Sequence, residues 1–148
     1  MILYVDTSAV VKALLFEVGS TDVERWYARA DEVAASVITF AEACAALGHS
    51  ARMHGSDTAT LAASVASLEA QWDEFFVLPV PEREAGQAAL RHGLRGMDAV
   101  QLATALELRA LASAQAPGVE VVVASYDRRL LEAAEREGFA TLGGPLGT

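Results

Sequence analysis

Short apolar runs alternate with helical segments along this chain, and this alternation restricts the fold more than any other feature of the sequence. The run ILYV at residues 2–5 has no polar alternation, and VEVVVA at 119–124 is the most β-branched stretch. Apolar strands of this kind are typical of a parallel sheet that is covered on both faces. Parallel strands need crossover connections, so the sequence predicts an α/β fold with helices flanking the sheet.

Turn residues and capping patterns set the expected boundaries of the elements. Gly19, Gly55 and Gly138 end helices, while TDVE at 21–24 and TFAE at 39–42 are capping-box patterns that open them. We expect strands at residues 2–5, 33–36, 75–80, 119–124 and 140–142. We expect helices from residue 7 or 8 to Phe16 and at 21–30, 39–54, 58–73, 82–92, 98–114 and 127–137. Residues 1–142 then form one domain, and 143–148 a loop-like tail.

Charge and composition restrict the partners of this domain. Of 148 residues, 53% are hydrophobic, which is enough for one core. The net charge of −9, considered alone, disfavours nucleic acid as a partner, because phosphate contacts require clustered Lys and Arg. Four arginines are nevertheless candidate phosphate contacts, namely Arg91, Arg95, Arg128 and Arg129. Solvated charge at helix ends explains them equally well.

The cysteine content and the apolar N-terminus bear on the compartment. Cys44 is the only cysteine, which excludes an internal disulfide and suits a reducing cytoplasm. The apolar N-terminus lacks the basic region of a signal peptide, and Asp6 interrupts it. No run approaches the length of a membrane span. We therefore expect a cytoplasmic protein without membrane association.

Four acidic residues occupy similar places in the expected fold: Asp6 ends the first strand, and Glu42, Asp98 and Asp127 lie at the starts of helices. Ligands bind beyond the carboxyl ends of the strands in open parallel sheets. Four carboxylates at that edge repel one another and favour a bound cation. Mg²⁺ and Mn²⁺ prefer oxygen ligands and can activate water against a phosphate ester, so no protein nucleophile is needed.

Each of these residues also has a structural explanation. Asp6, Asp98 and Asp127 can cap helices or favour a helix start through their negative charge. Glu42 occupies the third helical position of the TFAE capping box, which suits a purely structural role. The coincidence of all four at one edge is what favours a site.

Around these residues the chain resembles the PIN-domain nucleases, and specifically the VapC-type toxins of toxin–antitoxin pairs. The matching segments are YVDTSA at 4–9, TFAEA at 39–43, MDAVQLATA at 97–105 and ASYDRRL at 124–130. The resemblance implies a single-domain PIN fold with a five-stranded parallel sheet in the order 3-2-1-4-5. It also implies that Asp6, Glu42 and Asp98 bind the metal ion, and that Asp127 completes the site directly or through water.

Further expectations follow from the same resemblance. Ser8 and Ser125 match positions where the family often has a hydroxyl near the site. The implied activity is Mg²⁺- or Mn²⁺-dependent cleavage of RNA that leaves a 5′-phosphate and a 3′-hydroxyl. The implied partners are a second copy of the chain and a small VapB-type antitoxin that blocks the site. Ser125-Tyr126 stands before Asp127 where the family often has threonine and a different spacer.

Two other classes of function compete with a nuclease. A catalytically silent module of the same fold would bind metal or protein without cleaving, although such a scaffold has no use for four mutually repelling acids. A phosphotransfer domain would use the aspartate after the first strand as its nucleophile. Ser8 stands where such phosphatases carry a second aspartate, and Lys12 is the only lysine, so this class ranks low.

Overall fold

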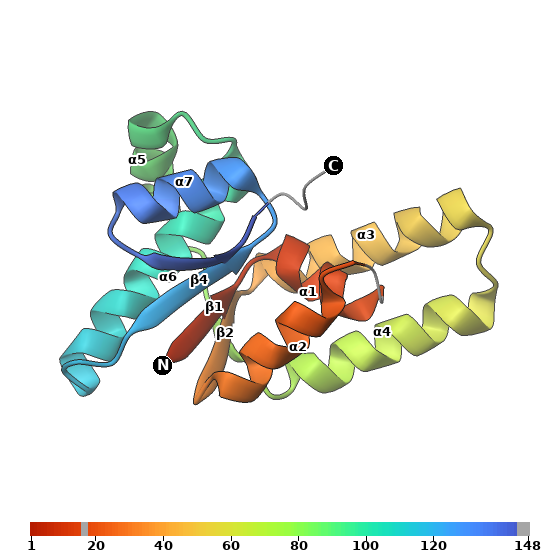
Figure 1. Ribbon diagram of the computed structural model, residues 1–148. Helices are drawn as coiled ribbons and strands as arrows, with labels where there is room; N and C mark the ends of the chain where they lie inside the picture. The colour runs from red at the N-terminus through yellow and green to blue at the C-terminus, as the bar shows by residue number, and fades with distance from the viewer. Residues whose placement is uncertain (16–17, 145–148) are drawn as a thin grey trace.

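Five parallel strands form the centre of the protein in a computed structural model that describes residues 1–15 and 18–144 (Figure 1). The strands are β1 (Ile2–Val5), β2 (Glu32–Ser36), β3 (Phe76–Leu78), β4 (Val121–Ser125) and β5 (Ala140–Gly143). They pair in the order β3-β2-β1-β4-β5, and every pair is parallel. The predicted fold class and strand order are therefore confirmed.

Helices cover both faces of this sheet. They are α1 (Thr7–Leu14), α2 (Ser20–Arg29), α3 (Ile38–His54), α4 (Thr58–Trp72), α5 (Glu82–His92), α6 (Gly96–Gln115) and α7 (Arg128–Arg136). Helices α1 to α4 lie on one side and α5 to α7 on the other (Figure 1). None of the helices in the described ranges is long and apolar enough to cross a membrane.

The central strands bury side chains on both faces, which explains their unbroken apolar sequences. In β1, Tyr4 packs into the core beneath α5 to α7, while Leu3 and Val5 pack into the core beneath α1 to α4. Val122 and Val123 of β4 divide between the two cores in the same way. Successive residues of a strand point to opposite faces, so a strand covered on both sides has no polar position.

Helices α3 and α4 form a long hairpin that extends beyond the sheet (Figure 1). The buried residues of α3, namely Thr39, Ala43 and Leu47, all lie in its first ten residues, and α4 buries only Leu68. Gly55 ends α3 in the left-handed conformation, with φ +64°, and Asp57 caps α4. The part of α3 nearest the sheet is therefore the part that can contribute to a site.

Two predicted capping boxes are wrong. Helix α2 begins at Ser20 after Gly19, whose φ of +100° suits glycine, and Thr21 makes no cap. Helix α3 begins at Ile38, and no side chain caps it. The buried Thr39 hydroxyl instead accepts a hydrogen bond from Gln101 of α6. A distant buried donor thus competes with the local capping pattern.

Other boundaries differ less from the expected ones. Helix α6 starts two residues before Asp98, because Arg95 is its N-cap residue. Helix α1 ends at Leu14, and Phe16, the expected end of this helix, lies outside the described residues. Strand β5 extends into the expected tail as far as Gly143, and residues 145–148 of that tail are also not described.

Candidate active site

The four acidic residues converge on one cavity of about 390 Å³ at the carboxyl ends of the central strands. Asp6 comes from the β1–α1 junction, Glu42 from α3, Asp98 from α6 and Asp127 from the β4–α7 junction. The remaining lining residues are Thr7, Ser8, Val11, Lys12, Leu15, Ala46, Gln101 and Tyr126. Four segments that are distant in sequence therefore bring their carboxylates to the edge where open parallel sheets bind ligands.

Asp6 is almost completely buried, with 6% of its surface exposed. Its Oδ1 accepts hydrogen bonds from the Ala9 amide at 3.0 Å and from the Ser8 hydroxyl at 2.7 Å. Burial raises the pKa of Asp6 from 3.8 to about 6, although the hydrogen bonds from Ser8, Ala9 and Ser125 oppose this rise. The carboxylate therefore caps α1 and is at the same time an unfavourable buried charge.

Two serine hydroxyls tie Asp6 to the β4–α7 junction. Ser125 donates to Asp6 Oδ2 at 3.0 Å, and its oxygen accepts the Asp127 amide at 2.9 Å. The Ser8 oxygen accepts the Tyr126 amide at 2.8 Å. Ser8 and Ser125, the two hydroxyl positions singled out in the sequence, thus orient one carboxylate and fix the backbone that carries another.

Glu42 has no capping role in this fold. It is the fifth residue of α3, so it does not occupy the third position of a capping box. Its Oε2 accepts hydrogen bonds from the Thr7 hydroxyl at 2.5 Å and from the Gln101 amide group at 3.3 Å. The structural explanation proposed for Glu42 is therefore wrong, and its carboxylate is held toward the cavity by groups from two other helices.

Asp98 and Asp127 share an arginine partner. Asp98 lies in the first turn of α6, where its Oδ2 accepts a hydrogen bond from Arg95 Nε at 3.2 Å. Asp127 caps α7, because its Oδ1 accepts the Leu130 amide at 3.0 Å. Its other oxygen, Oδ2, lies 3.8 Å from Arg95 Nη2. Asp127 is thus a helix cap through one oxygen, while the other is directed to Arg95.

The four candidate arginines do not share one location. Arg95 pairs with carboxylates of the cavity, whereas Arg91 pairs with Glu137 at 2.9 Å. Glu137 lies at the opposite end of α7 from Asp127, about 14 Å away along the nine-residue helix. Arg128 is exposed and pairs with Glu132 at 3.7 Å, and Arg129 is exposed without lining the cavity.

Gln101 is a site residue that the sequence reasoning missed. It is 3% exposed, its Oε1 accepts the Tyr4 hydroxyl at 2.7 Å, and its Nε2 donates to Thr39 and Glu42. A signal was present, since Gln101 is a polar residue three positions after Asp98 in a helix that is otherwise apolar there. Gln101 links the core to Glu42 and so orients this carboxylate.

The wall of the cavity that includes Tyr126 is aromatic and basic. Lys12 Nζ lies 5.1 Å from the centre of the Tyr126 ring, and Tyr126 stacks on Trp26 with ring centres 6.0 Å apart. The Tyr126 hydroxyl donates to the Gly19 carbonyl at 3.2 Å. A Cβ at residue 19 would lie 2.8 Å from that hydroxyl, so the contact requires glycine.

The donor set fits a hard divalent cation. As the side chains stand, no three His, Cys, Asp or Glu residues of the described part of the chain are close enough to hold one ion. The four carboxylates nevertheless line one cavity and supply only oxygen ligands, which Mg²⁺ and Mn²⁺ prefer. Asp98 and Asp127, which are half-buried, face the exposed guanidinium of Arg95. The identity of the cation stays a prediction.

Known proteins resemble this chain over nearly its whole length. The sequence profile of the PIN domain family matches residues 3–136. Ribonuclease VapC45 and Ribonuclease VapC49, from two strains of Mycobacterium tuberculosis, are each 35% identical over 144 residues, which cover 93% of this chain and 92% of each relative.

Solved structures share the fold. PAE2754 from Pyrobaculum aerophilum has a TM-score of 0.62 and 25% identity, over 94% of this chain and 82% of its own. VapBC-1 from nontypeable Haemophilus influenzae has a TM-score of 0.60 and 17% identity, over 97% and 98% of the two chains. FitAB bound to an IR36 DNA fragment has a TM-score of 0.52 and 22% identity, over 100% and 99%. At these identities the last two establish only the fold.

Proposed function

This chain belongs to the PIN domain family and to its VapC-type ribonucleases, and on that premise we propose how it cleaves RNA. Asp6, Glu42, Asp98 and Asp127 would hold a divalent cation, Mg²⁺ or Mn²⁺. Water bonds to the phosphorus of a phosphodiester and the bond to the 3′ oxygen breaks, which leaves a 5′-phosphate and a 3′-hydroxyl. The observation that carries this proposal is the convergence of the four carboxylates on one cavity.

The chemistry of the cation explains why this cavity needs acids and no protein nucleophile. A divalent cation polarises the scissile phosphate and makes water a stronger nucleophile at neutral pH. The helix starts at Asp6, Asp98 and Asp127 add partial positive charge that favours anions there. Both effects offset the repulsion between an anionic backbone and an acidic cavity.

The protein's own contribution is to hold the carboxylates in place before substrate arrives. Ser8, Ser125 and the Ala9 amide fix Asp6, while Thr7 and Gln101 fix Glu42. Groups that are oriented in advance need no reorganisation during the reaction, which is the main source of electrostatic catalysis. Within the described part of the chain, the partner of the Asp98 carboxylate is the exposed Arg95.

The decisive experiment is cleavage of total bacterial RNA with added Mg²⁺ or Mn²⁺, followed by sequencing of new 5′ ends. Wild-type protein should produce discrete ends that carry a 5′-phosphate, and Asp98→Asn or a chelator should abolish them. Absence of new ends with folded, antitoxin-free protein would instead favour a catalytically silent member of the family.

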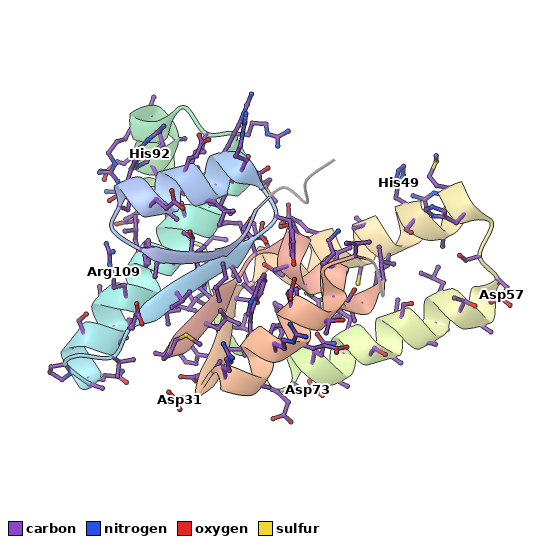
Figure 2. The ribbon with its side chains drawn as sticks, viewed as in Figure 1. Asp31, His49, Asp57, Asp73, His92 and Arg109 are labelled. Atoms are coloured by element: carbon purple, nitrogen blue, oxygen red, sulfur yellow. The ribbon has the colours of Figure 1, made fainter. Side chains whose placement is uncertain are left out.

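A matched control separates catalysis from helix capping. Asp57 caps α4 as Asp127 caps α7, since its Oδ1 accepts the Thr60 amide at 2.7 Å. Asp57 lies at the far tip of the α3–α4 hairpin, away from the cavity (Figure 2). We expect Asp57→Asn to cleave RNA as well as wild type and Asp127→Asn to cleave much more slowly. Equal cleavage by both variants would show that Asp127 is only a cap.

The partners and the location are part of the same proposal. The similarity to VapC ribonucleases supports a small VapB-type antitoxin that blocks the cavity, a homodimer and a cytoplasmic location, where the RNA substrate is found. Light scattering of the purified protein measures the oligomeric state, and fractionation of cells that express it measures the location. Addition of the antitoxin to the cleavage reaction should suppress the new 5′ ends.

A further inference from the structure

We propose that Arg95 is a phosphate-binding residue that Asp98 and Asp127 hold until a divalent cation displaces it. The inference rests on the proposed function and narrows the four candidate arginines to one. It assigns Arg95 two successive partners, first the carboxylates of Asp98 and Asp127 and then, once the cation has bound, a phosphate of the RNA backbone next to the cleaved bond.

The competition between Arg95 and the cation follows from the oxygens that they share. Asp127 Oδ1 is committed to the Leu130 amide, which leaves Oδ2 as the oxygen available to a cation. Arg95 Nη2 lies 3.8 Å from that same Oδ2, and Arg95 Nε lies 3.2 Å from Asp98 Oδ2. A cation bound to these two oxygens replaces the guanidinium and repels it, because both carry positive charge.

A displaced Arg95 side chain has room in a neighbouring cavity. This second cavity, of about 430 Å³, is lined by Glu42, Arg95, Gly96, Met97 and Asp98. It shares Glu42 and Asp98 with the acidic cavity, so the two are adjacent. The Arg95 side chain is 72% exposed, and its backbone is fixed at the start of α6. The guanidinium can therefore turn away from the carboxylates and contact a backbone phosphate where the RNA strand runs from the acidic cavity into this second cavity.

The geometry of the guanidinium and the positions of the other arginines favour this assignment. A guanidinium forms paired hydrogen bonds with a phosphate as well as with a carboxylate, so Arg95 suits both partners. Arg91 is engaged by Glu137, which also pairs with His92, and Arg128 pairs with Glu132 on its own helix. Neither of these arginines lines the two cavities.

The first test measures cation binding without RNA. Titration calorimetry with Mn²⁺ compares wild type, Arg95→Gln and Arg25→Gln. Arg25 is the matched control, because it is 69% exposed and forms the same kind of ion pair, three residues from Asp22 on α2. An exposed pair is weak, so loss of the competitor should tighten the Mn²⁺ Kd of Arg95→Gln by about two- to fivefold. Arg25→Gln should match wild type.

The second test measures RNA binding. The probe is a fluorescent 12-nucleotide oligouridylate, with Ca²⁺ in place of the catalytic cation and RNA integrity checked on a gel. Each phosphate contact to a single strand contributes about 0.7 to the slope of log K against log salt. With Ca²⁺ present, Arg95→Gln should make this negative slope shallower by about that amount. With EDTA, Arg95→Gln and wild type should have the same slope. Arg95→Lys, which keeps the charge, should retain most of the slope.

The outcomes separate this inference from the proposed function. If wild type binds Mn²⁺ and cleaves RNA, but Arg95→Gln binds Mn²⁺ no more tightly, the competition is disproved while the nuclease stands. A slope that falls equally with Ca²⁺ and with EDTA would also overturn the inference, because Arg95 would then reach phosphate without displacement. If wild type neither binds Mn²⁺ nor cleaves RNA, both proposals fail together.

Discussion

The two ends of α7 place carboxylates in opposite electrostatic surroundings. At its start, Asp127 lines a cavity with three other acids, and Asp6 in that cavity has its pKa raised to about 6 by burial. At its end, the Glu137 carboxylate lies 2.6 Å from His92 Nε2 and 2.9 Å from Arg91 Nε. Arg109 donates a hydrogen bond to the main-chain carbonyl of Glu137. Chiefly the hydrogen bond from His92 lowers the pKa of Glu137.

This difference separates a carboxylate that stabilises the fold from the carboxylates that we propose serve the reaction. Glu137 connects α7 to α5 and α6 through compensated charge, and His92 and Arg109 lie on that side of the molecule (Figure 2). In the cavity, Asp98 and Asp127 share the exposed Arg95, so the charge of the four acids is compensated less completely than that of Glu137 and costs stability until a ligand arrives. A buried carboxyl with a raised pKa in a cavity, such as Asp6, is typical of functional sites. Substitution of an acid at the start of α7 should therefore affect RNA cleavage more than stability, whereas substitution of Glu137 should affect stability more than cleavage.

The largest expected effect is on cleavage. Asp98→Asn should slow RNA cleavage by about 100- to 1,000-fold, because it removes a carboxylate that would hold the cation. Its melting temperature should stay the same or rise, since one of four repelling charges is lost. Glu137→Gln should cleave within twofold of wild type and melt at a lower temperature. A sharp loss of stability in Asp98→Asn would remove the contrast between the two ends.

The next effect is on the pH dependence of stability in the metal-free protein. The folded protein holds the Asp6 proton more tightly than the unfolded chain, with a pKa of about 6 against 3.8. Stability should therefore fall as the pH rises from about 4 to about 6, by at most about 3 kcal/mol. Urea unfolding in EDTA at several pH values measures this slope. Asp6→Asn should flatten it, and an unchanged slope would assign the effect to other groups.

Glu137 should show the opposite sign. Its folded pKa is lowered, so its stabilising contribution is present above its unfolded pKa and is lost as the pH falls through the folded value. Glu137→Gln should cost about 1–3 kcal/mol at pH 7, because two charged hydrogen bonds are weakened. The cost should shrink in acid, where wild type is protonated as well. Urea unfolding of both proteins at pH 7 and pH 3 tests this. A loss of unfolding free energy that does not depend on pH would show that Glu137 stabilises the fold through packing and not through its charge.

The smallest effect concerns a hydroxyl. Ser125→Ala removes the donor to Asp6 Oδ2 and the acceptor of the Asp127 amide, which should cost about 1 kcal/mol of stability. Cleavage should fall by about tenfold, because Asp6 is less well oriented. Ser64→Ala removes an α4 hydroxyl that donates only to the Thr60 carbonyl and serves as the control. Equal cleavage by both variants would show that Ser125 has no orienting role.

The sequence predicted the sheet well, because its information is local to each strand. The unbroken apolar runs at β1 and β4 reflect burial on two faces, and the acids that follow them lie at the edge expected for a ligand. The capping boxes failed because capping depends on distant partners. The Thr39 hydroxyl accepts a hydrogen bond from Gln101 instead of capping α3. The left-handed conformation of Gly19 lets α2 begin at Ser20, one residue before the predicted start.

The sequence did not allow side-chain partners on different helices to be predicted. Arg91 and Arg95 look alike in a short basic segment, yet one binds Glu137 and the other Asp98. Only the contact between the end of α5 and Glu137, the residue that follows α7, separates them, and no local pattern encodes it. Gln101 was missed for the same reason, since its partners Tyr4, Thr39 and Glu42 come from three other elements.

The bond between Asp6 and Ser125 joins residues 119 positions apart, and β1 pairs with β4 along its whole length. A chain leaving the ribosome therefore presents Asp6 early but cannot form this bond until Ser125 has been synthesised. At about 5–20 residues per second, the first strand waits several seconds for its central neighbour. The acidic cavity therefore cannot form before β4 and the start of α7 have left the ribosome.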